Sequence, residues 1–289
     1  MKVAEVLDKY TRGGLGQAFA CVDLEDAREI RIRQGLPVVV RRLAGETVLD
    51  YKPHGADIAG VLERMASHSL YAYDAELKNG FITIGGGHRV GISGRVVLEN
   101  GKIKTLRHFS GLTIRIARQV LGSADEILPH VLGSDAMVYN TLIASPPGQG
   151  KTTVLRDLVR QLSNGGRNIS VVDERSEIGG SFQGAVQNDL GQRTDVLDGA
   201  PKAEGMLLML RAMSPDVIAV DEIGGEEDVK ALLAVASCGA KIIATIHGDN
   251  MADLRRKQSL APLFDNQIFD KYIFLTDNPT PGTVREVVG

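Results

Sequence analysis

A glycine loop between an apolar run and a helical pattern constrains this chain more than any other feature. The apolar run covers residues 138–144, and a helical spacing continues over residues 152–163. The segment that joins them reads Ser145, Pro146, Pro147, Gly148, Gln149, Gly150, Lys151, Thr152 and Thr153. A strand, a glycine loop that ends in Lys-Thr, and a helix form the context of a P-loop. The loop therefore predicts a nucleotide-phosphate site inside an α/β fold.

Each part of this loop has a physical role in holding phosphate. Backbone N–H groups and the helix N-terminus form a positive cradle, and Lys151 adds a point charge at the β- and γ-phosphates. Thr152 is expected to place its hydroxyl on Mg²⁺. Ser145 departs from the motif, whose first position is glycine, but Gly148 and Gly150 are present where backbone meets phosphate. We expect ATP with Mg²⁺ as the ligand, and a Lys151 side chain that faces solvent without it.

After residue 120 the chain alternates buried-type strands with helical patterns. Strands are predicted over residues 137–144, 169–173, 217–221 and 242–246, and helices over residues 152–163, 203–213 and 226–236. This alternation predicts a mostly parallel sheet with helices on both faces. We therefore predict a RecA-like P-loop domain over residues 121–289, with a hinge segment at residues 121–132.

The first 120 residues follow a different pattern. Alternating runs at residues 29–33 and 37–42 flank one turn, and runs at residues 81–84 and 89–98 flank three glycines and His88. These signals predict β-hairpins. Apolar residues at a helical spacing between residues 57 and 73 predict one helix. We predict a small α+β domain over residues 1–120, with His88 as a turn residue.

Polar side chains follow three further strands of the predicted parallel sheet. Asp221 and Glu222 end one strand, and Glu174 follows another. His247 ends a third. Because ligands bind at the carboxyl ends of such strands, these side chains are candidates for chemistry. Asp221 is suited to hold Mg²⁺, and we assign Glu222 as the base that deprotonates the attacking water, with Glu174 as the alternative base. His247 is expected to sense the γ-phosphate, the alternative being a satisfied core histidine.

The order of these motifs resembles that of a known superfamily. A P-loop, an acidic box at residues 173–174, an Asp-Glu pair at residues 221–222 and a histidine box at residues 245–248 are similar to those of the secretion and type IV pilus ATPases. Within it, three segments resemble the stage III sporulation protein AA family. They cover residues 173–178, 191–196 and 201–206. The resemblance extends over the whole chain.

This resemblance implies an ATPase of endospore formation that forms a ring. It implies a homo-oligomer, a hexamer by resemblance, and membrane proteins of a channel between mother cell and forespore as partners. In such rings an arginine of one subunit completes the site of its neighbour. Arg193, expected in a polar loop before a helix, is the first candidate, with Arg175 and Arg211 behind it and ordinary ion pairing as the alternative. The alternative for the whole chain is an ATP-binding switch or scaffold with negligible hydrolysis, because Ser145 distorts the loop.

Composition narrows the classes of partner. The net charge is −3, and aromatic residues make up 4% with no Trp, so no nucleic-acid partner is expected. Residues 1–120 carry 18 Lys and Arg against 13 Asp and Glu, whereas residues 121–289 carry 15 against 23.

Cys21 and Cys238 are too few for a disulfide framework or a zinc cluster. No apolar stretch reaches the ~20 residues of a membrane span, so we expect a soluble cytoplasmic protein. The resemblance implies a peripheral place at a membrane through partners.

Overall fold

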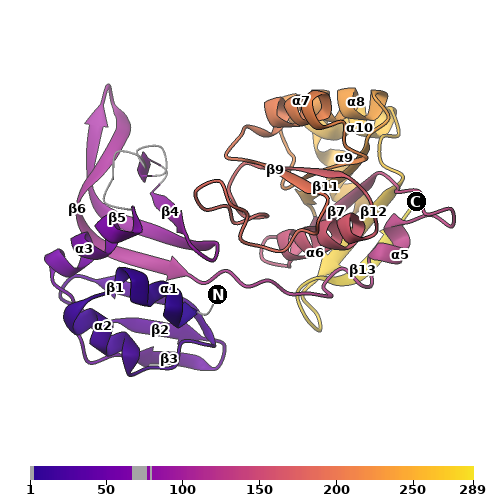
Figure 1. Ribbon diagram of the computed structural model, residues 1–289. Helices are drawn as coiled ribbons and strands as arrows, with labels where there is room; N and C mark the ends of the chain where they lie inside the picture. The colour runs from indigo at the N-terminus through magenta and orange to yellow at the C-terminus, as the bar shows by residue number, and fades with distance from the viewer. Residues whose placement is uncertain (1–2, 67–76, 79) are drawn as a thin grey trace. The chain divides into compact units, whose positions relative to one another are not determined.

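The computed structural model describes residues 3–66, 77–78 and 80–289, which form two units (Figure 1). Unit 1 is Met1–Arg118 and unit 2 is Gln119–Gly289. Each unit contains one β-sheet and its own apolar core. Among these described residues, no helix has the length and apolar character of a membrane span.

Unit 1 contains a six-stranded antiparallel sheet in the order β3-β2-β1-β6-β5-β4. Its strands are β1 (Ala27–Arg33), β2 (Val39–Arg42), β3 (Gly45–Val48), β4 (Phe81–Ile84), β5 (His88–Glu99) and β6 (Lys102–Arg115). Its helices are α1 (Val3–Tyr10), α2 (Gly13–Ala20) and α3 (Gly55–Met65). Ile30 and Ile32, at alternate positions of β1, are buried in one cluster with Leu7 and Leu62 of the helices. The helices therefore cover one face of this sheet.

Both predicted hairpins of unit 1 are confirmed, since β1 pairs with β2 and β4 pairs with β5. Helix α3 covers the first part of the predicted helical segment, and residues 67–73 of that segment lie outside the described residues. The prediction of His88 as a turn residue is wrong, because His88 is the first residue of β5 and only 3% exposed. Its Nδ1 accepts a hydrogen bond of 3.1 Å from the N–H of Ala117. Burial lowers the pKa of His88 to about 4.

Unit 2 contains a seven-stranded sheet in the order β13-β12-β7-β11-β10-β8-β9, parallel except for β13. The strands are β7 (Thr141–Ser145), β8 (Ile169–Asp173), β9 (Thr194–Asp198), β10 (Val217–Val220), β11 (Lys241–His247), β12 (Lys271–Thr276) and β13 (Thr283–Val288). The helices are α5 (Leu128–Val131), α6 (Lys151–Asn164), α7 (Lys202–Met213), α8 (Glu226–Ser237), α9 (Met251–Arg256) and α10 (Ala261–Asp265). Leu142 packs in one apolar cluster with α7 and α8, and its neighbour Ile143 packs in another with α6. Helices therefore cover both faces of the sheet.

This arrangement confirms the predicted mostly parallel sheet. The four predicted strands correspond to β7, β8, β10 and β11, and the three predicted helices to α6, α7 and α8. Strand β7 begins only at Thr141, four residues later than predicted. Strands β9, β12 and β13 were not predicted. The expected hinge segment contains turns and the short helix α5.

Candidate nucleotide-binding site

The glycine loop joins β7 to α6 at the carboxyl edge of the parallel sheet (Figure 1). Gly148 and Gly150 have φ of +79° and +87°, a left-handed conformation that residues with a Cβ adopt only at a cost. Ser145 does not have a positive φ. Its hydroxyl donates a hydrogen bond of 2.9 Å to the carbonyl of Pro146. The chain therefore departs from the motif at a position whose backbone does not require glycine.

A turn of the last hairpin lies against this loop. A Cβ on Gly150 would stand 2.9 Å from the nitrogen of Gly282 and 3.1 Å from the carbonyl carbon of Pro281. This turn joins β12 to β13. Position 150 therefore needs glycine for space as well as for its φ. The sequence does not indicate this contact, because the turn is distant along the chain and neither β12 nor β13 was predicted.

Lys151 is enclosed by its own loop. Its Nζ donates to the carbonyls of Ser145 and Pro146 at 3.0 and 3.1 Å, and lies 3.1 Å from Nδ1 of His247. Only 5% of the residue is exposed, so the expectation of a solvent-facing lysine is wrong. The loop folds its carbonyls around the ammonium, and burial lowers the pKa of Lys151.

Thr152 and Asp221 meet at the end of the sheet. The hydroxyl of Thr152 donates a hydrogen bond of 2.6 Å to Oδ2 of Asp221, although the two residues lie on different elements. The other carboxylate oxygen of Asp221 accepts a hydrogen bond from the hydroxyl of Thr245 in β11. Hydroxyl and carboxylate oxygens are the hard donors that Mg²⁺ prefers. The donor set therefore fits this cation, and Thr245 is a member of the site that the sequence did not single out.

Glu222 is held between His247 and Arg175. Its Oε1 lies 3.0 Å from Nε2 of His247, and its Oε2 accepts a hydrogen bond of 3.1 Å from Nη1 of Arg175. The backbone of Glu222 has φ of +53°, and its N–H donates to the hydroxyl of Thr245 at 2.8 Å. A residue other than glycine rarely adopts this left-handed backbone conformation, and where it does, surrounding contacts stabilise it. The side chain of His247 is 45% exposed, so it is not a core histidine.

The two residues of the acidic box lie in different environments, since Asp173 is buried and Glu174 is exposed. Asp173 is buried and accepts hydrogen bonds from the backbone N–H groups of Glu177, Ile178 and Gly179 at 2.8–2.9 Å. Burial raises the pKa of Asp173 to about 6. Glu174 instead forms an ion pair with Lys202, the first residue of α7. A small cavity between the two strand ends is lined by both box residues and by Glu222.

Arg193 lies at the opposite edge of the sheet. It directly precedes β9, and its carbonyl accepts a hydrogen bond from the N–H of Ile169 at the start of β8. Its Nη1 is 3.4 Å from Oδ1 of Asn168. The prediction of a loop before a helix is therefore wrong, because a strand follows. Of the three arginines considered, the structure brings Arg175 alone to the glycine loop's edge.

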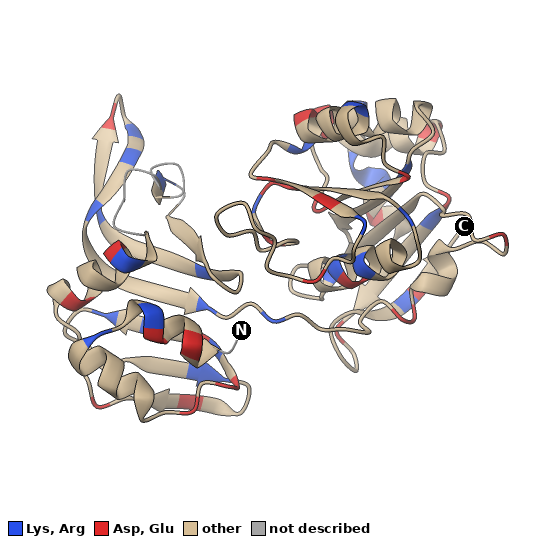
Figure 2. Cartoon of the chain, viewed as in Figure 1, with Lys and Arg blue, Asp and Glu red and all other residues tan. Residues whose placement is uncertain are grey.

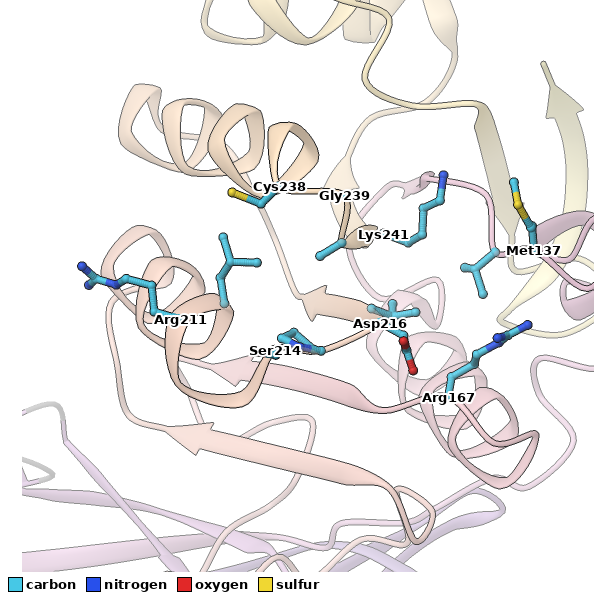
Figure 3. A pocket seen from close by; sticks show the side chains of 13 residues that line it. Met137, Arg167, Arg211, Ser214, Asp216, Cys238, Gly239 and Lys241 are labelled. Carbon is cyan, nitrogen blue, oxygen red and sulfur yellow. The ribbon is translucent and has the colours of Figure 1, made fainter.

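A larger pocket also lies at the amino edge. It has a volume of about 600 Å³ and includes the first residues of β10 and β11. Figure 3 shows Arg211, Ser214, Asp216 and Lys241 around it. The Asp216 carboxylate accepts a hydrogen bond of 2.8 Å from the N–H of Asn168. The pocket is thus separated from the glycine loop by the length of the strands, and it places the candidate Arg211 away from that loop.

The chain is similar to known proteins over its whole length. The family described as "Sporulation stage III, protein AA" matches residues 2–289. The "Stage III sporulation protein AA" of Bacillus subtilis (strain 168) is 43% identical over 291 residues, which cover 99% of this chain and 94% of the relative. The similarity therefore includes both units.

Two solved structures are similar in fold. The ATPase DotB of Yersinia pseudotuberculosis superposes with a TM-score of 0.61 at 16% identity, covering 93% of this chain and 76% of its own. The pilus retraction motor PilT, solved with bound ADP, gives a TM-score of 0.60 at 15% identity, covering 95% of this chain and 78% of its own. At this identity the likeness shows the fold, which confirms the predicted fold class.

Proposed function

The chain belongs to the stage III sporulation protein AA family, and from this premise we propose that it is an ATPase that works in endospore formation. ATP with Mg²⁺ binds at residues 145–153 and is hydrolysed there. The two-unit fold shared with DotB and PilT supports this assignment. The residues of the glycine loop and of three neighbouring strand ends supply the chemistry.

The observation that carries the proposal is the meeting of Thr152 with Asp221 beside the Lys151 ammonium. The Thr152 hydroxyl and the Asp221 carboxylate, 2.6 Å apart, present oxygen atoms where the helix begins. A bound Mg²⁺ supplies positive charge that neutralises the phosphate oxygens. Lys151 binds the β- and γ-phosphates after it exchanges the carbonyls of Ser145 and Pro146 for phosphate oxygens. This exchange keeps the ammonium hydrogen-bonded in both states.

Glu222 is the proposed base. Its carboxylate lies next to Asp221 in the chain and at the same strand end, so a water held there is within its reach. His247 contacts Lys151 through Nδ1 and Glu222 through Nε2. It therefore senses the arrival of phosphate when Lys151 moves. Glu174 supports the metal shell from the neighbouring strand, and Arg193, at the amino edge, can act only on a neighbouring subunit.

Equilibrium titration with ATP and steady-state phosphate release test this function. We expect ATP binding that strengthens with Mg²⁺, and phosphate release that depends on it. A chain that binds no nucleotide at millimolar ATP would contradict the proposal at its first step. Mass measurement with and without ATP and Mg²⁺ tests the further proposal that the chain forms a homo-oligomeric ring, a hexamer by family resemblance.

The partners proposed for this ring are membrane proteins of a sporulation channel, and its proposed location is the cytoplasmic face of that membrane. The description of the family as a sporulation protein supports a role in sporulation, and the channel partners and the location are what the resemblance implies. Reconstitution with candidate channel proteins should raise the rate of phosphate release. A rate unchanged by every channel protein would argue against this part of the proposal.

A second candidate function is an ATP-binding switch with negligible hydrolysis. One observation favours it: both carboxylate oxygens of Glu222 are already engaged, by His247 and Arg175. A base that stayed in these contacts would not deprotonate water. Phosphate release measured with and without partners separates the two functions, because a switch binds ATP tightly and releases no phosphate under either condition.

A further inference from the structure

The hairpin formed by β5 and β6 extends beyond the sheet of unit 1. Strand β1 pairs with β6 only over residues 111–115, and β4 pairs with β5 only over residues 88–91. Among the described residues, residues 95–107 therefore form a two-stranded ribbon whose ladder partners are each other (Figure 1). Isolated two-stranded ribbons are marginally stable in water. We therefore expect a long ribbon that projects from its sheet to be stabilised by contact with another surface.

One face of this ribbon is aliphatic and exposed. Val96 pairs with Leu106, and Leu98 pairs with Ile103 across the ladder. Side chains at positions 96 and 98 point to the same face because strand residues alternate. Val96 is 43% exposed, Leu98 62% and Ile103 47%. These three are half of the six large apolar side chains that are exposed in the described part of unit 1.

The other face of the ribbon carries Arg95 and Arg107 beside the partly buried Val97, and the tip of the ribbon is basic. Arg95 lies directly opposite Arg107 in the ladder, an arrangement of like charges that is unfavourable unless an anion lies near. Neither arginine has a side-chain hydrogen bond or ion pair with the described residues. Lys102 and Lys104 add two further cations, and the single acidic residue, Glu99, is paired with Lys104. Figure 2 shows blue bands along this hairpin and one red band near its end.

We propose that the β5–β6 ribbon docks on the surface of an anionic lipid bilayer. An amphipathic element with aliphatic residues on one face and Lys and Arg on the other lies in the interface plane of such bilayers. The aliphatic face enters the headgroup boundary, and the long basic side chains reach around the ribbon to the lipid phosphates. Unit 1 as a whole is basic, with 18 Lys and Arg against 13 Asp and Glu, which adds attraction toward the same surface.

Lipid fits this surface better than nucleic acid or an acidic protein segment does. Nucleic-acid platforms stack bases on aromatic side chains, and the ribbon residues 95–107 contain none. A purely electrostatic partner would leave Val96, Leu98 and Ile103 in water. A bilayer surface accommodates both faces at once. The ribbon is in a different unit from the glycine loop, so this proposal does not rest on the proposed ATPase activity.

A single tryptophan tests insertion directly, because the chain contains no Trp of its own. The full chain carrying Leu98→Trp is mixed with vesicles of phosphatidylcholine and phosphatidylglycerol in a two-to-one ratio. We expect a blue-shifted emission and protection from acrylamide quenching. Leu43→Trp is the matched control, since Leu43 is equally an exposed leucine of unit 1 but lies outside the ribbon. An unshifted Leu98→Trp, or an equal shift at both positions, overturns the proposal.

Cosedimentation with the same vesicles tests the charges. Replacing Arg95 and Arg107 by Gln should weaken vesicle binding about fivefold for each cation removed, equal to ~1 kcal/mol each. The matched double variant Arg28→Gln with Lys52→Gln should weaken it less than about twofold, because these charges lie outside the ribbon and are screened. Binding to pure phosphatidylcholine that equals binding to the anionic vesicles overturns the proposal. The proposal is also overturned if the chain binds a duplex oligonucleotide through the ribbon and does not bind the vesicles.

Discussion

The two units bury their sheets in different ways, and this difference decides where their polar residues lie. In β1 of unit 1 Ile30 and Ile32 are buried, while Glu29 and Arg31, at the alternate positions, remain partly exposed on the uncovered face. In unit 2 every residue of β7, β8 and β10 is buried. A sheet covered on both faces leaves its strand ends as the places for functional polar groups. Unit 2 therefore gathers them at one edge, whereas unit 1 spreads them along its surface.

This contrast teaches how each unit responds to substitution. At the carboxyl edge of unit 2 the polar groups have particular partners, as between Thr152 and Asp221 at 2.6 Å or Glu222 and His247 at 3.0 Å. Loss of one group there leaves others unpaired. On the ribbon of unit 1 the proposed attraction to an anionic bilayer is divided among several exposed cations, so each contributes a small part of the binding free energy. We therefore expect large effects of single changes in unit 2 and graded effects in unit 1.

The largest effect is expected for Lys151→Ala. Nucleotide affinity should fall about a hundredfold and turnover should fall with it, because the point charge at the β- and γ-phosphates is lost. Calorimetric titration with ATP and Mg²⁺ measures the affinity. Lys257→Ala is the matched control, since Lys257 donates to the His247 carbonyl at the same edge without belonging to the loop. Equal losses in both variants would mean that the edge, and not the loop, carries binding.

The next effect separates the two candidate bases. Glu222→Gln keeps the shape of the side chain but removes the basic oxygen, so phosphate release alone should fall about a hundredfold. ATP affinity should stay at or above that of the parent, and the ATP-bound oligomer should accumulate. Glu174→Gln should raise the Mg²⁺ concentration needed for turnover. If Glu222→Gln keeps the parental rate while Glu174→Gln is inactive at saturating Mg²⁺, the assignment of the base is reversed.

The sequence predicts much of unit 2 because its strands are continuous apolar runs. Strand β8 is observed over Ile169–Asp173, the range that was predicted. Strand β9 was missed because three of its five residues are polar and all five are at least partly exposed at the edge of the sheet, a composition typical of a loop. In unit 1 the hairpins are predictable from alternation and glycine turns. The burial of His88 is not, since it depends on packing against the distant Ala117.

The candidate site shows the same limit. Strand order alone predicts that Lys151, Asp221 and His247 meet at one edge, because parallel strands end there together. It does not predict the contact of Arg175 with Glu222. That contact depends on the path of the loop after β8, which three hydrogen bonds to Asp173 and a positive φ at Ser176 determine. Such loop paths follow no periodicity in the sequence.

Opposite responses to acid sharpen the comparison of the units. The pKa of His88 in unit 1 is lowered to about 4 by burial, so its neutral form is favoured in the folded state. Its contribution to the free energy of unfolding is fully present above pH ~6.5 and is lost as the pH falls through ~4. The free energy of unfolding changes by about 3 kcal/mol over this range. The pKa of Asp173 in unit 2 is raised to about 6, so its contribution is present below pH ~3.8 and is lost as the pH rises through ~6.

Hydrogen exchange measured by mass spectrometry resolves these responses by unit. On acidification from pH 7 to pH 4, slowly exchanging amides of unit 1 should lose protection relative to those of unit 2, after correction for intrinsic rates. His88→Gln should flatten the response of unit 1, and Asp173→Asn should flatten that of unit 2. A response that stays in place in both variants would mean that other groups produce it.

The smallest effects are expected from two arginines at opposite edges of the same sheet. Arg175→Ala removes an exposed partner of Glu222, and exposed ion pairs contribute ~0.2–1 kcal/mol, so turnover should rise by a few-fold at most as the base is released. Arg193→Ala should leave ATP affinity within about twofold, because its guanidinium lies beside Asn168 at the amino edge. Phosphate release measured across a dilution series distinguishes a further role for Arg193. A loss confined to concentrations at which the chain assembles assigns it to a neighbour's site, whereas a loss at every concentration contradicts its placement away from the glycine loop.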